Sequence, residues 1–141
     1  MEPIDKAPGG MTPHGIVPDD IAPNVLEAFH MMWDKHPSPV MLTRPNRTIV
    51  AANAAARAVG IEPGRKCFTL CGPDKPCAAC RANQAVRDDA CVRSLSYTEA
   101  GNRFVDGYWT PLAGVPGLFL HYANDITQCV REELLRPGCT C

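Results

Sequence analysis

Apolar and polar residues alternate along this chain of 141 residues with two periods, one typical of helices and one typical of strands. From residue 24 to residue 36, apolar side chains recur at positions i, i+1, i+4, i+7 and i+8, which form one stripe of an amphipathic helix. Asp19 or Asp20 can begin this helix, and the string "HPSP" ends it. The stripe consists of Val25, Leu26, Phe29, Met32 and Trp33.

The segments that follow have the composition of strands. The string "VMLTRPNRTIVAAN", residues 40–53, contains two short apolar runs on either side of a turn, which predicts a β-hairpin. Asn53 is a suitable N-cap for the short alanine-rich helix after it, and Gly60 closes that helix. The last third of the chain predicts three more strands, at residues 91–98, 103–112 and 117–124.

Two further helices are predicted around these strands. The string "AACRANQAVRDD", residues 78–89, has high helix propensity, and Pro76 lies at or just before its first turn. Near the C-terminus, Asp125 is placed to cap a helix, with Gln128 as in a capping box, and Gly138 ends it. This order of elements, with its consecutive hairpins, predicts an α+β fold with a five-stranded antiparallel sheet and helices on one face.

Composition and charge narrow the class of protein. A proline occurs every five residues from Pro3 to Pro23, and five residues cannot give each unit an apolar face, so we interpret residues 1–22 as a flexible tail. The chain is 45% apolar and 21% charged, as in ordinary soluble domains. A net charge of -1 and short apolar runs predict no binding of nucleic acid and no membrane span. Since the N-terminus lacks a signal-peptide pattern, we expect a cytoplasmic protein.

Four of the eight cysteines lie within the string "CFTLCGPDKPCAAC". The spacing Cys67-x3-Cys71-x5-Cys77-x2-Cys80 supplies four soft donors separated by loop residues, as tetrahedral zinc or an iron–sulfur cluster requires. Disulfides are rare in the cytoplasm, and packing alone explains such clustering poorly. The string therefore predicts a metal site, with redox-active thiols and inert buried cysteines as the alternatives.

The residues do not choose between the two metals, because all-sulfur ligation suits zinc and iron–sulfur alike. Two other uses of the Cys77-x-x-Cys80 pair are disfavoured. Arg81 stands where covalent haem attachment needs a histidine. A thioredoxin-like site needs a parallel βαβ setting, which this order of elements does not provide.

Other candidate residues are scattered along the chain. We expect Cys91 and Cys129 to pack as small apolar residues, while Cys139 and Cys141 form at most an accessory metal or redox pair. His121 alternates with apolar neighbours on a strand, so it faces either solvent or a ligand pocket, depending on which neighbours face the core. The sequence contains no nucleophile–base set, phosphate loop or paired-carboxylate motif, so we expect no enzymatic activity.

Several of these strings together resemble the PAS domain, a small sensory module of bacterial signalling proteins. The matching strings are "PVMLTRPNRTIVAANAAARAVG" and "YANDIT", the second of which contains Asp125-Ile126-Thr127. Some PAS domains also carry a string like "GRKC", followed by nine residues and then a Cys-x-x-Cys, to which this chain adds Cys71. The resemblance covers residues 23–127. It implies a sensory or interaction module in which the Asp-Ile-Thr string passes into a signalling helix.

The sequence thus predicts a PAS-like sensory or regulatory module. Residues 1–22 form its tail, residues 23–127 the PAS-like domain, and residues 128–141 a signalling-helix stub with a cysteine-containing end. The family context favours an iron–sulfur cluster, for redox or oxygen sensing, slightly over zinc. The alternative is a ligand- or partner-binding module with a structural zinc, and the third is a thiol–disulfide oxidoreductase. We also expect a small molecule in the PAS pocket and a signalling partner or second copy bound through the flanking helices.

Overall fold

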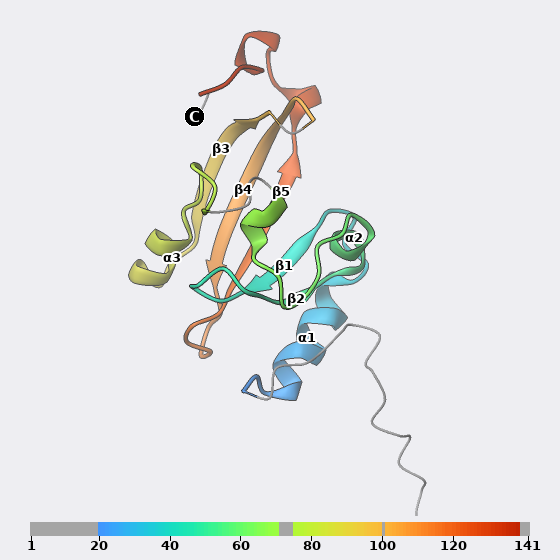
Figure 1. The fold of residues 1–141 in the computed structure, drawn as a ribbon, viewed down its shortest axis with the longest axis vertical. Coiled ribbons are helices and arrows are strands. Elements are labelled where there is room, and N and C mark those ends of the chain that lie inside the picture. Colours follow the sequence, from blue (N-terminus) through green and yellow to red (C-terminus); the bar gives the residue numbers. More distant parts are fainter. Residues whose placement is uncertain (1–19, 71–74, 100, 139–141) are drawn as a thin grey trace, which may run out of the picture.

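In the computed structural model, which describes residues 20–70, 75–99 and 101–138, five strands form one antiparallel sheet (Figure 1). Their order across the sheet is β2-β1-β5-β4-β3, so the N-terminal hairpin lies beside the last strand. The strands are β1 (Val40–Thr43), β2 (Ile49–Ala52), β3 (Val92–Thr98), β4 (Arg103–Pro111) and β5 (Phe119–Asp125). The three C-terminal strands begin and end within two residues of their predicted bounds.

The predicted N-terminal hairpin is confirmed, and a tight turn closes it. The backbone N–H of Arg47 donates to the carbonyl of Arg44 at 2.8 Å. Arg47 has a φ of 72°, in the left-handed region that side-chain-bearing residues seldom adopt. Across the neighbouring strands, Met41 of β1 pairs with Ala52 of β2 and with His121 of β5. Strand β1 of the hairpin therefore lies between β2 and β5.

Short helices cover one face of the sheet, which we call the inner face, as predicted (Figure 1). Ala56 of α2 packs against Met41 of β1, and Ala82 of α3 packs against Trp109 and Phe119 of β4 and β5. The elements over this face are α2 (Ala54–Ala58), the 3₁₀ helix η1 (Cys67–Leu70) and α3 (Ala82–Asp88).

The N-terminal helix α1 (Pro23–Trp33) packs against the opposite face, which we call the outer face. Its buried residues Leu26 and Phe29 belong to one apolar cluster with Leu42 of β1. Trp33 lies against Tyr122 of β5, with 5.6 Å between the ring centroids. Since successive side chains of a strand point to opposite faces, the outer position of Tyr122 places His121 on the inner face. The sheet thus separates α1 from the other helices.

The prediction of one continuous C-terminal helix from Asp125 to Gly138 is wrong. Over these residues the described structure forms two separate 3₁₀ turns, η2 (Thr127–Cys129) and η3 (Glu132–Leu134). Val130, between them, has extended backbone angles. Most of this segment is exposed, and a helix this short needs an apolar surface to pack against.

Two helix starts also differ from the prediction. Asp20 does not cap α1; it pairs with Arg44 at 2.7 Å, and α1 begins at Pro23. The helix predicted over residues 78–89 begins only at Ala82, because a turn occupies the residues before it. None of the described helices is long and apolar enough to cross a membrane.

Candidate functional site

A pocket lies between the inner face of the sheet and the cysteine-containing segment. It has two adjoining parts, of about 160 Å³ and about 450 Å³. The larger part alone falls within the range of about 300–1,000 Å³ typical of ligand sites. We call both parts together the inner pocket. They share a set of lining residues, namely Pro76, Cys77, Cys80, Trp109 and His121.

Trp109 and His121 form the sheet side of the inner pocket. They are directly opposite each other in the β4–β5 register, and their rings stack with centroids 4.7 Å apart. His121 Nδ1 donates to the carbonyl of Tyr108 at 2.8 Å, so Nε2 is the unprotonated nitrogen of the neutral ring. Removal from water lowers the pKa of His121, and the positive charge of Arg47 lowers it further. Of the two orientations left open by the sequence, His121 therefore takes the pocket-facing one, as a neutral imidazole.

The cysteine segment forms the opposite wall. Cys67, Cys77 and Cys80 all line the smaller part of the inner pocket, and the latter two also line the larger part. A turn joins Cys77 and Cys80, since the N–H of Cys80 donates to the carbonyl of Cys77 at 2.9 Å, and α3 begins only after them. Cys71 lies outside the described residues. Within the described ranges, no three ligating side chains are grouped closely enough to hold one metal ion.

Arg47 was not identified from the sequence, because an arginine in a turn is usually solvated. Here only 6% of it is exposed, and it lines the smaller part of the inner pocket. Its Nη1 donates to the carbonyl of Pro45, and its Nη2 donates to Asn83 Oδ1 of α3 at 3.0 Å. The buried Nε has no hydrogen-bond partner. A buried cation thus lies beside the thiols.

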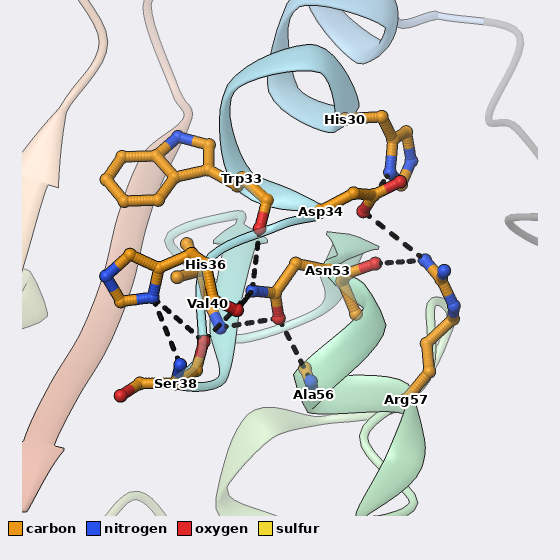
Figure 2. Close-up of polar contacts among 10 residues, drawn as sticks. His30, Trp33, Asp34, His36, Ser38, Val40, Asn53, Ala56 and Arg57 are labelled. Atoms are coloured by element: carbon orange, nitrogen blue, oxygen red, sulfur yellow. Dashed lines mark hydrogen bonds and ion pairs between the residues drawn. The ribbon is translucent and has the colours of Figure 1, made fainter.

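Asn53 joins α1 to the core (Figure 2). The predicted cap of α2 is confirmed, because Asn53 Oδ1 accepts from the N–H of Ala56 at 3.0 Å. The same oxygen accepts from the N–H of Val40, at 2.9 Å. Its Nδ2 donates to the carbonyls of Trp33 and Ser38, at 3.0 and 2.9 Å. One fully buried amide therefore connects the end of α1, the start of β1 and the start of α2, a role that the sequence did not reveal.

A second polar contact ties α1 to α2 beside this amide (Figure 2). Asp34, directly after α1, lies 3.0 Å from His30 Nδ1 and 3.9 Å from Arg57 Nη1 of α2. Arg57 also donates to the carbonyl of Ala52, at 2.6 Å. The position of α1 is thus linked to the helix that covers the inner face.

The Asp-Ile-Thr string fixes the end of β5. Asp125 Oδ1 accepts from the backbone N–H of Thr127 at 3.0 Å and from its hydroxyl at 2.6 Å. These hydrogen bonds lower the pKa of Asp125. Thr127 Oγ1 in turn accepts from the N–H of Phe104 on β4, at 2.9 Å. The string therefore anchors the chain as it leaves the sheet.

The other cysteines lie away from the inner pocket or outside the described residues. Cys91 and Cys129 are exposed, which corrects the expectation that they pack in the interior. Cys91 Sγ accepts a hydrogen bond from the hydroxyl of Thr110 at 3.1 Å. Cys139 and Cys141 lie outside the described residues.

No family model matches the chain, and no curated protein matches it. Among solved structures, a domain of an HTR-like protein from Haloarcula marismortui ATCC 43049 matches with a TM-score of 0.50 and 20% identity. That match covers 64% of this chain and 99% of that one. An RNA-binding light-oxygen-voltage receptor matches with a TM-score of 0.54 and 18% identity, over 90% of this chain and 39% of the receptor.

These matches define the class of fold. Both are to PAS-type structures, and the five-stranded antiparallel sheet with short helices over its inner face agrees with them. The chain therefore has the PAS fold that its sequence resembles. At 20% and 18% identity, the likeness to these structures concerns the fold alone. The RNA binding in the receptor's name is a property of the receptor.

Proposed function

We propose that this chain is a sensory module whose input site is the inner pocket. The observation that carries the proposal is the composition of that pocket, where Cys67, Cys77 and Cys80 face the stacked pair of Trp109 and His121. Thiols bind metals and are oxidised readily, and a neutral imidazole binds metals and accepts hydrogen bonds from small ligands. Their position between the sheet and its covering helices suits a site where a local change alters the packing around it.

The finer part of the proposal is a metal centre held by Cys67, Cys71, Cys77 and Cys80. Three of these four residues line one pocket, which supports a common function. The described residues do not by themselves form a site, so metal binding would have to draw the segment together. An iron–sulfur cluster would supply redox chemistry, whereas a zinc ion would supply stability, because the free energy of metal binding adds to that of folding.

Strand β5 links the inner pocket to the C-terminal segment, so it can transmit a structural change from one to the other. Phe119 and His121 line the pocket, and the same strand ends at Asp125, whose side chain holds Thr127 against β4. A shift of β5 would change how the residues after Thr127 leave the sheet. We propose that this segment and α1 contact the downstream partner, which is a signalling protein or a second copy of the chain.

The first test is the metal and acid-labile sulfide content of the full chain, purified without oxygen. We expect about one metal centre per chain, with iron, sulfide and visible absorption for the cluster, or zinc without colour for the structural site. The double variant Cys77→Ser/Cys80→Ser should lose the metal. The matched control is Cys91→Ser, which removes an exposed thiol outside the pocket and should keep it.

The result can also contradict the metal centre. Wild-type protein without metal after reconstitution, or equal metal in wild type and the double variant, would exclude these four residues as its ligands. Reversible oxidation of the thiols, with a shift in the stability of the domain, would then support the sensory role without metal.

A further inference from the structure

Arg47 is a buried cation without a described counter-charge. Its side chain is 94% removed from solvent by the fold, since 6% of the residue is exposed. None of the ion pairs among the described residues includes it. Burying an unpaired charge is costly, and native proteins usually compensate it with an anion. The position of Arg47 beside a pocket indicates that the anion comes from outside the chain.

The guanidinium group is held in place before any ligand arrives. Nη1 is tied to the carbonyl of Pro45 and Nη2 to Asn83, so the group is fixed between the hairpin and α3. The backbone is fixed as well, because the carbonyl of Arg47 accepts from the N–H of Cys67 at 3.0 Å. Such a fixed donor binds an anion without the loss of side-chain entropy that a mobile surface arginine incurs.

Among the described residues, the lining of the smaller part of the pocket around Arg47 is largely apolar and contains no acidic side chain. Its apolar lining includes Met41, Phe68, Trp109 and Phe119. In such surroundings a charge–charge attraction is stronger than in water. The walls therefore favour a ligand with an apolar body and one anionic group, over a highly charged ligand such as a polyphosphate.

A second unpaired polar group lies in the larger part of the inner pocket. Ser94 of β3 lines this part, and its buried hydroxyl has no hydrogen-bond partner. Ser96, two residues along the same strand, lines it on the same face. Between Arg47 and these serines lies the flat stacked pair of Trp109 and His121. The pocket thus offers a cation at one end, hydroxyls at the other and aromatic surface between them.

From this arrangement we propose that the inner pocket binds a small organic acid with a ring-sized apolar body. Its carboxylate pairs with Arg47, its body packs on Trp109 and His121, and a second polar atom reaches Ser94. The inference rests on the proposed function in that it names the ligand of the same pocket. It does not require the metal centre.

The test is calorimetric titration of the full chain with 4-hydroxyphenylacetate and with its neutral counterpart, 4-hydroxyphenylacetamide. The two probes share size and ring, so their difference isolates the charge. We expect the acid to bind at least about tenfold more tightly, as for a charge-assisted contact in an apolar site. Arg47→Gln should remove this preference. Arg65→Gln, which removes an exposed arginine outside the pocket with the same change in net charge, should keep it.

Folding is checked by the circular dichroism of each variant, and the comparison of the two probes on wild-type protein needs no variant at all. Equal affinity for acid and amide would overturn the proposal. So would an absence of binding at millimolar concentration for 4-hydroxyphenylacetate, phenylacetate and octanoate alike. Repeating the titration after metal removal separates this outcome from failure of the metal centre, which the metal analysis reports independently.

Discussion

The two faces of the sheet differ in how fully their buried polar groups are paired. On the outer face, Asp106 accepts two hydrogen bonds from Arg93, at 2.7 and 2.9 Å, and a third from the hydroxyl of Tyr108 at 3.0 Å. These contacts lower the pKa of Asp106, with the bond to Arg93 as the main cause. On the inner face, Arg47 and Ser94 are equally buried, yet each keeps a polar atom without a partner.

Apolar residues pack on both faces. Leu42 of β1 faces outward into the cluster that contains the residues of α1, and it is 1% exposed. Its neighbour Met41 faces inward and lines the inner pocket. The outer face also keeps a cavity of about 200 Å³ beside α1, which Leu42 lines, and the buried Nε1 of Trp33 has no partner there.

The two faces therefore differ mainly in their buried charges. Asp106 on the outer face is paired with Arg93, whereas none of the ion pairs among the described residues includes Arg47 on the inner face. The comparison supports the proposal that the inner pocket, beside the unpaired charge of Arg47, is the binding site.

The largest expected effect comes from truncating the apolar cluster on the outer face. Leu42→Ala should lower the free energy of unfolding by about 4 kcal/mol, because Leu42 is 1% exposed and packs against the buried residues Leu26 and Phe29 of α1. Met41→Ala, one residue away, should cost about 2 kcal/mol, because Met41 is more exposed, at 7%, and packs in the smaller cluster of the inner face. Urea unfolding of both variants measures the difference. Equal losses would mean that the inner face is as tightly filled as the outer one.

The attachment of α1 to the outer face can be broken at one residue. Asn53→Ala removes five hydrogen bonds from a fully buried amide and leaves the N–H groups of Val40 and Ala56 without their side-chain acceptor, so we expect a loss of about 3 kcal/mol. Hydrogen exchange should show increased opening in α1. Asn24→Ala, at an exposed position of α1, is the matched control and should change stability by less than about 0.5 kcal/mol. A loss below about 1 kcal/mol for Asn53→Ala would show that apolar packing alone holds the helix.

The smallest effect concerns the inner face and depends on pH. Burial lowers the pKa of His121 below its ordinary value of 6.5, so below that pH the unfolded chain binds a proton that the folded chain resists. The contribution of His121 to stability is therefore constant above about pH 6.5 and is lost as the pH falls below it. His121→Asn, which does not titrate, should lose less stability between pH 7.5 and 5.5 than wild type in urea unfolding. An identical loss in both proteins would contradict a buried neutral imidazole.

Patterns of neighbouring residues predicted the strands and the start of α2, because these elements depend mainly on residues close in the sequence. Alternation and turn residues placed all five strands, and the N-cap role of Asn53 followed from a short polar side chain before an alanine-rich helix. The C-terminal helix failed for the opposite reason. The capping signals at Asp125 and Gln128 are local, but a short exposed helix depends on packing that the described segment lacks.

The candidate site divides in the same way. The spacing of Cys67, Cys71, Cys77 and Cys80 predicted a shared metal site. The structure places Cys67, Cys77 and Cys80 at one pocket, and the metal site itself stays a prediction. The sequence could not indicate Arg47, because burial of a turn arginine depends on α3 and the cysteine segment, which are distant in the sequence. The sequence also did not decide which face of the sheet His121 points to. Alternation along a strand allows two orientations, and only the packing of a neighbouring side chain selects one.

By itself, then, the sequence determined the strands and the α+β class, because these depend on residues within a few positions of one another. Only the tertiary structure decided which side chains of the sheet face α1 and which face the inner pocket. It also decided that Arg47 and Ser94 are buried without full pairing, and that one asparagine joins α1 to the core. These features depend on contacts between segments 13 to 36 residues apart, as in the bonds from Asn53 to Val40 and from Arg47 to Asn83, and no local pattern encodes them.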